Sequence, residues 1–406
     1  MAADRCPGVL RLVEAADGYL ARVRLPGGLV GAGEMRVLAR LAGELGDGRV
    51  ELTSRGNVQL RALAAGAAGP LTDELTQAGL LPSLSHDRVR NVLASPLAGL
   101  DGGPDLTGIV RALDDALCAR PRLAELSGRF LFAVDDGRGD VAGFGADVTA
   151  WVGAGGAVVN GLAVSGSVDA VVAAMLACAE AFLDEAAASG GTAWRIADLA
   201  DGDERVRAAV AARLRLGAAT QPVGAVQSAD APHPVGAVQP VAAPQPADAR
   251  QPAAAPRGPA GAGGARPAGI VGPGGTTAVL LAPLGRLTGK QLSWLAGLVT
   301  GRPARITPWR SVVLPDLADA AGVLRDAALL GFGVDAGSPW LRVTACAGRP
   351  GCASALADVQ ADAAEFAARW PDRIVHVSGC ARHCGRPVAT DIDVTATAVG
   401  YQVAGV

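Results

Sequence analysis

Two segments of the chain, residues 28–63 and 285–317, repeat one order of sequence patterns, and this repeat restricts the possible folds more than any other feature. Each segment begins with a glycine-bounded turn and continues with apolar residues at helical spacing. A short strand that ends in Thr53 or Thr307 follows, and after it come an arginine-bearing turn and another apolar strand. Two copies of a β-α-β-type half-unit predict a core with pseudo-twofold symmetry.

Composition divides the rest of the chain into further parts. Pro, Ala, Gly and Gln dominate residues 217–275, which lack aromatic side chains and therefore bury too little apolar surface to offset the entropy of ordering. Residues 85–216 show strand patterns at 129–135, 147–152 and 157–164 and a helical pattern at 168–189. We expect a first half-domain at 1–84, a middle α/β domain at 85–216, a disordered linker at 217–275, a second half-domain at 276–335 and a C-terminal domain at 336–406.

The bulk composition limits the classes of protein to which the chain can belong. Its 406 residues, half of them hydrophobic, are enough for two or three globular domains. A formal net charge of −3 does not indicate a nucleic-acid partner, and the odd count of seven cysteines argues against a secreted disulfide scaffold. The sequence has no apolar run of membrane-spanning length and no signal-peptide pattern, so we expect a cytoplasmic protein without a membrane partner.

Four of the seven cysteines form two closely spaced pairs in the last part of the chain. Five residues separate Cys346 from Cys352, and three separate Cys380 from Cys384. Each pair follows a strand pattern, so we expect both pairs at one edge of a sheet, with a helix at 352–369 between them. Zinc knuckles use spacings of about two to four residues, whereas an iron–sulfur cube accepts wider ones. The spacing therefore favours a [4Fe–4S] cluster, with zinc and four unligated thiols as alternatives.

The cysteine pairs and two further motifs resemble the siroheme-dependent sulfite and nitrite reductase superfamily. The further motifs are TPWR at 307–310 and TSRGNVQLR at 53–61, and the resemblance covers nearly the whole chain apart from the linker. It implies an α+β fold in which duplicated ferredoxin-reductase-like half-domains form the pseudo-twofold core, accompanied by two α/β sulfite-reductase-like domains. In that superfamily the four cysteines hold a [4Fe–4S] cluster, and the last one also bridges to the siroheme iron.

Three other stretches resemble one branch of that superfamily, the precorrin-3B synthases. They are CPGVLRLVEAADGYLARVRLPGG at 6–28, RNVLASPLAG at 90–99 and RFLFAVDDG at 129–137. The resemblance implies an O2-dependent monooxygenase that hydroxylates precorrin-3A at C-20 and closes an acetate side chain of ring A into a γ-lactone during cobalamin synthesis. It also implies an electron donor, a ferredoxin or a reductase supplied by reduced nicotinamide nucleotide, and a further mononuclear iron as a candidate cofactor.

A tetrapyrrole that carries many carboxylates needs fixed, planar cations, which arginine provides best. Arg55, Asn57, Gln59 and Arg61 alternate along one strand and so share one face, where we expect them to bind the substrate. A solvated edge strand is the alternative for this face. The matched motifs and the second repeat add the candidates Arg90, Asn91, Arg129, Arg305 and Arg310. For the last two, packing of the pseudo-twofold core is an equal alternative.

One departure from the reductase pattern bears on the reaction. Sulfite reductases offer two lysines at alternating positions of the middle-domain strand, where this chain has Arg129 and Leu131. Loss of one of two cations weakens a site for a small, doubly charged anion. A siroheme-dependent sulfite or nitrite reductase is therefore the second hypothesis, and a non-catalytic iron–sulfur or heme carrier on the same fold is the third.

The other titratable residues leave the catalytic groups unassigned. His376 alternates inside a strand and is expected in the core, whereas His383, between two cysteines, either tunes the cluster or faces solvent. The sequence shows no set of two histidines and one carboxylate that identifies the ligands of a further iron. His233, Cys6, Cys118 and Cys178 are expected to have no chemical role.

Overall fold

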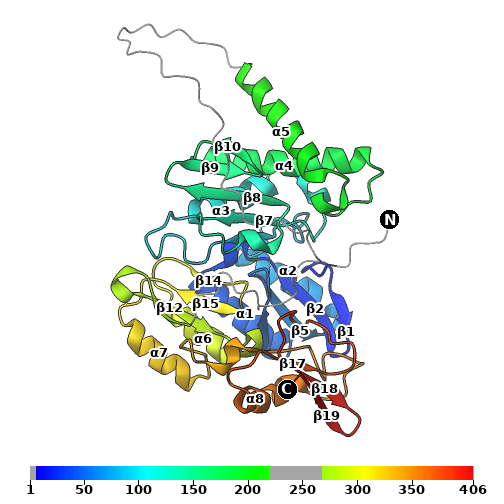
Figure 1. Cartoon of the computed structure of the whole chain (residues 1–406), viewed down its shortest axis with the longest axis vertical. Helices are drawn as coiled ribbons and strands as arrows, with labels where there is room; N and C mark the ends of the chain where they lie inside the picture. The colour runs from blue at the N-terminus through cyan, green and yellow to red at the C-terminus, as the bar shows by residue number, and fades with distance from the viewer. Residues whose placement is uncertain (1–5, 220–267, 406) are drawn as a thin grey trace.

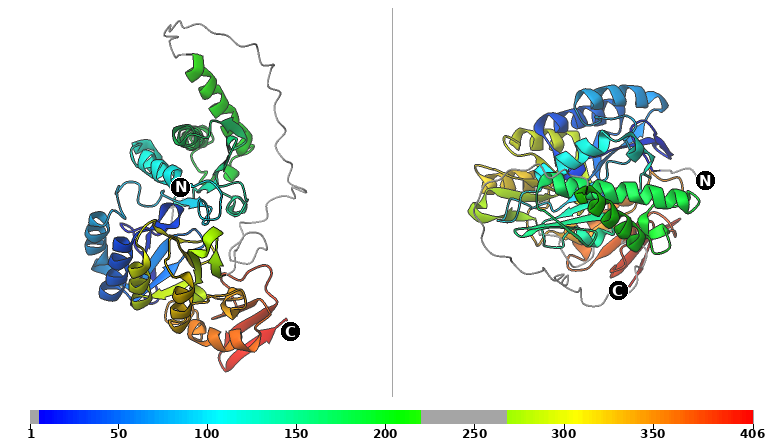
Figure 2. Two further views of the ribbon diagram at one scale, coloured as in Figure 1. Left: turned by 90° about the vertical axis from the view of Figure 1, so that its left-hand side faces the viewer. Right: turned by 90° about the horizontal axis from the view of Figure 1, so that it is seen from above.

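The computed structural model describes residues 6–219 and 268–405, which form three five-stranded sheets and one four-stranded sheet (Figure 1). A middle domain and a C-terminal domain lie at opposite ends of a central core (Figures 1 and 2). None of the helices in the described ranges is both long and apolar enough to cross a bilayer. The α+β fold with duplicated half-domains, expected from the sequence, is confirmed.

The two halves of the core contain the same elements in the same order. The first half consists of β1 (Val13–Ala15), β2 (Gly18–Val23), β3 (Leu29–Val30), α1 (Ala32–Leu45), β4 (Arg49–Leu52), β5 (Val58–Leu63) and α2 (Ala68–Gln77). The second consists of β11 (Gly269–Val271), β12 (Thr277–Leu281), β13 (Arg286–Thr288), α6 (Gly289–Leu298), β14 (Ala304–Ile306), β15 (Ser311–Leu314) and α7 (Ala320–Leu329). Met35, Leu38 and Leu41 of α1 and Leu292 and Leu295 of α6 are buried at helical spacing, so both helices present an apolar face to the core.

The two halves exchange one strand each. The first sheet has the order β1-β2-β5-β4-β13, and the second has the order β11-β12-β15-β14-β3. Leu287 of β13 pairs with Val50 of β4, and Val30 of β3 pairs with Ala304 of β14, both in antiparallel register. Helices α1 and α6 pack against each other, and one hydrophobic cluster contains buried side chains from both halves. The halves therefore form a single interlocked core.

The hairpin turns between β4 and β5 and between β14 and β15 have the same hydrogen bonds. Oγ1 of Thr53 accepts bonds from the N–H groups of Arg55 (3.3 Å) and Asn57 (3.1 Å). Oγ1 of Thr307 accepts the two equivalent bonds, each 3.2 Å long. Arg310 has a φ of 60° in its turn, a left-handed value that favours glycine, and the first turn has a glycine at that place. The duplication therefore extends to the geometry of the turns.

The middle domain is a five-stranded sheet with the order β10-β9-β8-β7-β6, in which β6, β7 and β8 are parallel. Its elements are β6 (Val92–Ala94), α3 (Thr107–Cys118), β7 (Phe132–Asp135), β8 (Val148–Gly153), β9 (Gly156–Val159), β10 (Leu162–Val164), α4 (Val168–Ala188) and α5 (Gly202–Ala219). The prediction of one strand at 157–164 is wrong, because Asn160 and Gly161 turn the chain into a hairpin with φ values of 45° and 82°. An Asn-Gly pair is a strong signal for such a turn.

The C-terminal domain is a four-stranded sheet with the order β16-β17-β18-β19, in which the first three strands are parallel. Its elements are β16 (Val343–Ala345), α8 (Val359–Arg369), β17 (Val375–Ser378), β18 (Ile392–Thr397) and β19 (Gly400–Ala404). The helix expected from residue 352 begins at Val359, because the preceding residues form a loop. Oδ1 of Asp358 accepts a hydrogen bond from the N–H of Ala361 over 3.2 Å and so caps the helix.

Most of the linker predicted at 217–275, namely residues 220–267, lies outside the described residues. At its first edge α5 continues to Ala219, and at its second edge β11 pairs with β12 through Ile270 and Ala278. The folded elements reach further into this segment than its composition suggests. Ile270 and Val271 have β-branched side chains, which favour a strand. They are surrounded by the small residues that dominate the composition of residues 217–275.

Candidate cluster and substrate site

The two cysteine pairs follow neighbouring parallel strands of the C-terminal sheet. Cys346 comes directly after β16, and Cys380 comes two residues after β17. Ala345 pairs with Val377, so the ends of the two strands lie side by side. The N–H of Gly379 donates a hydrogen bond to Sγ of Cys346 over 3.1 Å, which connects the second cysteine loop to the first. The two loops therefore begin at the same edge of the sheet.

The four thiols of these pairs are free of disulfides. Cys346, Cys352 and Cys380 are half-buried, and Cys384 is exposed. No three Sγ atoms in the described ranges come within 4.8 Å of one another, whereas the thiolates of a tetrahedral zinc site lie roughly 3.8 Å apart. A four-iron cube spreads its thiolates over a larger shell. Four thiols from two adjoining loops are the donor set that such a cluster needs.

Two side chains attach the first cysteine loop to the rest of the protein. Nη2 of Arg61 donates to the carbonyl of Gly351 over 3.1 Å, and its Nε donates to Oδ2 of Asp17 over 3.1 Å. Nε2 of Gln360 donates to the carbonyl of Cys346 over 3.1 Å. The sequence suggests substrate binding for Arg61, but the structure places its guanidinium between an aspartate and the cysteine loop.

Asp393 of β18 holds the second cysteine loop. Its Oδ2 accepts a hydrogen bond from Nη1 of Arg386 over 2.6 Å and lies 2.9 Å from Nδ1 of His383, which completes an ion pair when that ring is protonated. His376 is fully buried on β17, as expected for a core residue, and its Nδ1 shares a hydrogen bond of 2.8 Å with the hydroxyl of Thr344. Burial lowers the pKa of His376 to about 4, so this ring is neutral near pH 7.

Three arginines gather at one end of the first sheet. Arg22 lies on β2, Arg24 follows that strand, and Arg55 lies in the turn between β4 and β5. Burial lowers the pKa of each, to about 9 for Arg24, and the charge of Arg55 lowers the pKa of both others. Arg24 is 2% exposed, and its Nη1 has no hydrogen-bond partner in the described part of the chain. This arginine row favours an anion, which would offset the desolvation and mutual repulsion of its charges.

Arg22 and Arg24 are not among the residues that the sequence motifs pointed to, although a signal for both is present in the sequence. The two arginines alternate along the strand pattern, and Arg22 pairs with Gln59 across β2 and β5. Nε of Arg22 donates to Oε1 of Gln59 over 3.0 Å, so an arginine already occupies the amide expected to bind substrate. Pairing of the two strands in register would have placed both arginines on the face of Gln59.

The middle domain contributes Arg129, which is exposed and stacks on Trp194 with its guanidinium carbon 4.3 Å from the ring centroid. Burial is the main cause of the lowered pKa of Arg55, and the charges of Arg195 and Arg129 add to it. Leu131 is 2% exposed and packs in a small hydrophobic cluster of that domain. Arg129 therefore extends the positive charge of the arginine row, whereas Leu131 belongs to the core and offers no cation.

Arg90 and Arg305 join the core to the middle domain. Arg90 makes a buried two-point ion pair with Asp114 of α3, through bonds of 2.7 and 2.6 Å, and its Nη1 donates to the carbonyl of Leu80 over 2.9 Å. Nη1 of Arg305 donates to two carbonyls of the loop after β6, at 2.8 and 2.7 Å. The donors that a substrate carboxylate would need are thus used inside the chain.

The remaining predicted substrate residues lie apart from the arginine row or have partners. Nδ2 of Asn91 donates to the carbonyl of Gly128 over 3.0 Å, and Oδ1 of Asn57 accepts a bond from the N–H of Leu25 over 2.9 Å. Arg310 lines a cavity of about 50 Å³, where burial lowers its pKa. Of the predicted substrate residues, Arg55 and Arg129 are therefore the two whose guanidinium groups lie close enough to repel each other and form no ion pair that would neutralise them in the described part of the chain.

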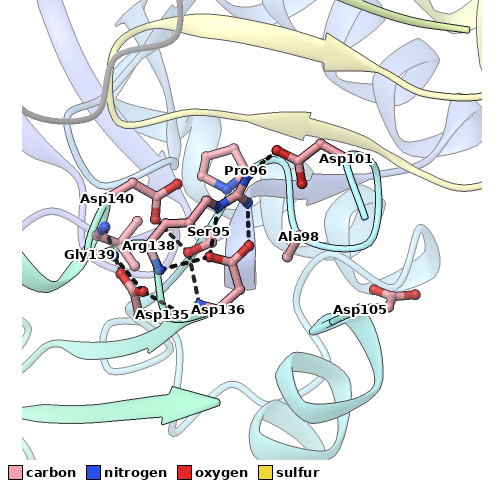
Figure 3. A network of polar contacts seen from close by, with 12 residues as sticks. Ser95, Pro96, Ala98, Asp101, Asp105, Asp135, Asp136, Arg138, Gly139 and Asp140 are labelled. Carbon is pink, nitrogen blue, oxygen red and sulfur yellow. Dashed lines mark hydrogen bonds and ion pairs between the residues drawn. The ribbon is translucent and has the colours of Figure 1, made fainter. Parts of the chain in front are cut away.

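A group of aspartates that no sequence motif pointed to lies at the carboxyl end of β7. Asp135, Asp136 and Asp140 each bring one carboxylate oxygen within 4.8 Å of the others (Figure 3). Two backbone N–H groups donate to Oδ1 of Asp135 at 2.9 and 2.8 Å, Arg138 pairs with Asp136, and Ser95 donates to Asp140 over 2.5 Å. Burial, with the neighbouring aspartates, raises the pKa of Asp140 to about 6. The three aspartates therefore have hydrogen-bond or ion-pair partners within the chain, and these contacts stabilise the turn after β7.

Comparison with known proteins agrees with this fold. Residues 13–78 match the family model described as the nitrite/sulfite reductase ferredoxin-like half domain, and this range corresponds to β1 through α2. The ferredoxin–nitrite reductases of Leptolyngbya laminosa and Synechococcus elongatus are 33% identical over 124 residues and 32% identical over 128 residues. These stretches cover 29% and 30% of the chain, and they span about a quarter of each relative, 24% and 25%.

One further relative and one solved structure match along nearly the whole chain. A precorrin-3B synthase from a Sinorhizobium species is 27% identical over 416 aligned positions, which cover 98% of the chain and 81% of the relative. The structure of the NirA protein of Mycobacterium tuberculosis is similar in fold, with a TM-score of 0.66 and 19% identity, over 95% of this chain and 73% of that one. The resemblance carried by the cysteine pairs and arginine motifs is thereby confirmed: residues 13–78 match the nitrite/sulfite reductase ferredoxin-like half domain, and the chain is similar over nearly its whole length to a precorrin-3B synthase.

Proposed function

We propose that the chain is a precorrin-3B synthase, an O2-dependent monooxygenase that hydroxylates precorrin-3A at C-20 and forms a γ-lactone in aerobic cobalamin synthesis. The observation that carries this proposal is the extent of similarity. The precorrin-3B synthase matches 98% of the chain, whereas the nitrite reductases match 29% and 30%. The burial of Leu131 adds support, because a site for a small anion would need a second cation beside Arg129.

Cys346, Cys352, Cys380 and Cys384 would hold a [4Fe–4S] cluster at the edge of the C-terminal sheet. Such a cluster supplies single electrons, which a ferredoxin or a reductase would deliver. The N–H of Gly379 is 3.1 Å from Sγ of Cys346 and would stabilise the thiolate form by donating a charge-assisted hydrogen bond. The two attachments of the first loop and the aspartate of β18 would keep the thiols in place.

The arginine row and Arg129 would bind carboxylates of the substrate. An entering carboxylate accepts charge-assisted hydrogen bonds from guanidinium groups and relieves the repulsion between them. The pKa of Arg24 is lowered to about 9, which is still above neutral pH, so this group is charged when the substrate arrives. Nη1 of Arg24, which lacks a partner in the described ranges, offers a donor for this purpose.

The proposed reaction consumes one O2 molecule and two electrons. One oxygen atom enters the substrate as a hydroxyl group at C-20, and the other leaves as water after it has taken up two protons. The acetate carboxyl group of ring A then adds across a ring carbon–carbon double bond next to the hydroxylated carbon, which forms the lactone C–O bond, and its proton passes to the macrocycle, so that no group leaves.

Labelled O2 tests the proposal. We expect the reconstituted protein, incubated with precorrin-3A, a reductant and labelled O2, to form a hydroxy-lactone that carries one labelled oxygen by mass spectrometry. The Cys384→Ala variant, prepared in the same way, is the matched control and should form none. Equal product under argon, or rapid sulfite reduction by protein purified with siroheme, would contradict the proposal and favour a reductase. A protein that binds iron and turns over neither substrate would favour a carrier.

A further inference from the structure

A series of polar contacts crosses the face of the first sheet opposite the hydrophobic core, beginning at the arginine row. Nε of Arg22 donates to Oε1 of Gln59 over 3.0 Å, and Nε2 of Gln59 donates to Oε2 of Glu51 over 3.3 Å. Oε1 of Glu51 forms an ion pair with Nε of Arg286 over 3.5 Å. These residues lie on β2, β5, β4 and β13, which are consecutive neighbours in the sheet. The contacts therefore pass from one half of the core to the exchanged strand of the other.

Arg286 continues the series to the first cysteine pair. Its Nη1 donates to Oε1 of Gln360 on α8, and its Nη2 donates to Oδ2 of Asp47 over 3.1 Å. Nε2 of Gln360 in turn donates to the carbonyl of Cys346 over 3.1 Å. The side chains of Arg286 and Glu51 are 20% and 18% exposed, so water screens their charges only partly. The series thus ends on the backbone of a proposed cluster ligand.

Arg61 reaches the same loop from the same sheet face. Its ion pair with Asp17 is well buried, with side chains 12% and 9% exposed, and it donates to the carbonyl of Gly351. A Cβ on Gly351 would lie 2.8 Å from Nη2 of Arg61, which shows how closely the loop approaches this arginine. Both ends of the loop between Cys346 and Cys352 therefore accept hydrogen bonds from side chains that the sheet holds.

We propose that Arg61 and Gln360 are positioning residues for the first cysteine pair, and that Glu51 connects this pair to the arginine row. The inference rests on the proposed cluster and substrate, but neither of these requires it. A hydrogen bond to the carbonyl of Cys346 fixes the backbone from which its thiolate projects. An anion that draws Arg22 away from Gln59 changes the partners of Glu51 and, through them, the environment of the cluster.

Iron retention tests the positioning role. In Gln360→Leu, which keeps the bulk but removes the bond to Cys346, we expect release of iron from the reconstituted protein to a chelator to accelerate roughly 3- to 10-fold. The midpoint potential of the cluster, followed by electron paramagnetic resonance (EPR), should shift as well. Arg61→Lys, which keeps the charge but loses the two-point contact, should show the same two changes. Arg40→Gln, on the exposed surface of α1, is the matched control and should show neither.

The outcome separates this inference from the proposed function. Wild-type release rates and potentials in both Gln360→Leu and Arg61→Lys would overturn the positioning role while leaving the cluster in place. Failure of the wild-type protein to hold iron and sulfide after reconstitution would refute the cluster itself. Because the two variants remove different bonds to the same loop, failure of one to fold leaves the other as a test.

Uroporphyrin III, a polycarboxylate tetrapyrrole, tests the connection. Adding it to the reconstituted wild-type protein should change the EPR spectrum of the reduced cluster. In Glu51→Gln, which keeps the shape of the side chain but removes its charge, the probe should still bind by fluorescence and the spectral change should be lost. Equal spectral changes in the two proteins, or none in a wild-type protein that binds the probe, would overturn the connection. Failure of the wild-type protein to bind the probe would overturn it together with the anion site.

Discussion

The N–H of Gly379 lies 3.1 Å from Sγ of Cys346, and this contact between the two cysteine loops depends on the absence of a side chain at residue 379. A Cβ there would lie 2.7 Å from the Cβ of Ala355 and 3.5 Å from the thiol. We expect Gly379→Ala to push the loops apart and to cost about 1–3 kcal/mol of stability, the usual cost of overpacking. Thermal unfolding and the iron content after reconstitution measure the effect.

The control for this variant is Gly43→Ala, on an exposed part of α1 where an added Cβ has open space. It should keep the iron and gain a little stability, because alanine favours a helix. A Gly379→Ala protein with wild-type iron content and melting temperature would show that the close approach of the loops does not matter for the site.

The paired and the isolated cysteines should respond differently to replacement. Alanine at any of the four paired positions, Cys346, Cys352, Cys380 or Cys384, removes one thiolate and should cause loss of most iron and sulfide. Cys118 is a suitable control, because burial raises its pKa to about 11 and so disfavours the thiolate that a metal needs. Iron and sulfide analysis of anaerobically purified Cys118→Ala should match the wild type. Full iron in all four paired variants would exclude these thiols as ligands.

Truncation of Arg55 and truncation of Arg90 should have different effects, the first on tetrapyrrole binding and the second on the stability of the fold. Arg55→Ala should weaken tetrapyrrole binding by about 1.5–3 kcal/mol, the value of a charged hydrogen bond, with little change in melting temperature. Arg90→Ala leaves Asp114, whose side chain is 14% exposed, without its partner and should instead destabilise the fold by about 3–5 kcal/mol. Calorimetric titration and thermal unfolding of both variants separate the two effects. A stable Arg90→Ala protein that has lost affinity would return Arg90 to the substrate site.

Asp140 should make stability depend on pH. Burial, helped by Asp135 and Asp136, raises its pKa from 3.8 in the unfolded chain to about 6 in the folded one. The folded state therefore binds this proton more tightly, and its contribution to stability falls as pH rises through this window. Asp140→Asn removes the charge and keeps an acceptor for Ser95, so it should raise the melting temperature near pH 8 and have little effect near pH 4. An equal change at both pH values would show that the charge is not its cause.

Local periodicity in the sequence predicts some elements of this fold. The partners of long side chains cannot be predicted in this way. The apolar spacing of α1 and α6 predicts both helices, because each buried residue follows from a period of a few positions. The spacing of the cysteine pairs is equally local. Arg90 shows the limit, since its guanidinium meets Asp114 only because α3 packs there, 24 positions further along the chain. Arg61 meets a carbonyl 290 positions away, which no local pattern encodes.

The site residues that the sequence does not reveal depend on the pairing of strands. Arg22 and Gln59 face each other because β2 and β5 are neighbours, and Glu51 meets Arg286 because β13 has crossed into the first sheet. A sequence pattern assigns each residue to one face of its own strand, but the order of strands in the sheet decides which faces adjoin. The polar series across that sheet therefore becomes visible once the sheet is assembled.

The exchange of β3 and β13 also bears on how the chain can be made. Val50 on β4 pairs with Leu287 on β13, which is far later in the sequence. During synthesis the edge of β4 therefore stays bare, with backbone groups open to pairing with other chains, until the second half has left the ribosome. Contacts of such sequence separation form slowly and expose the nascent chain to aggregation. Either half expressed alone should therefore aggregate, because each leaves a strand edge without its exchanged partner.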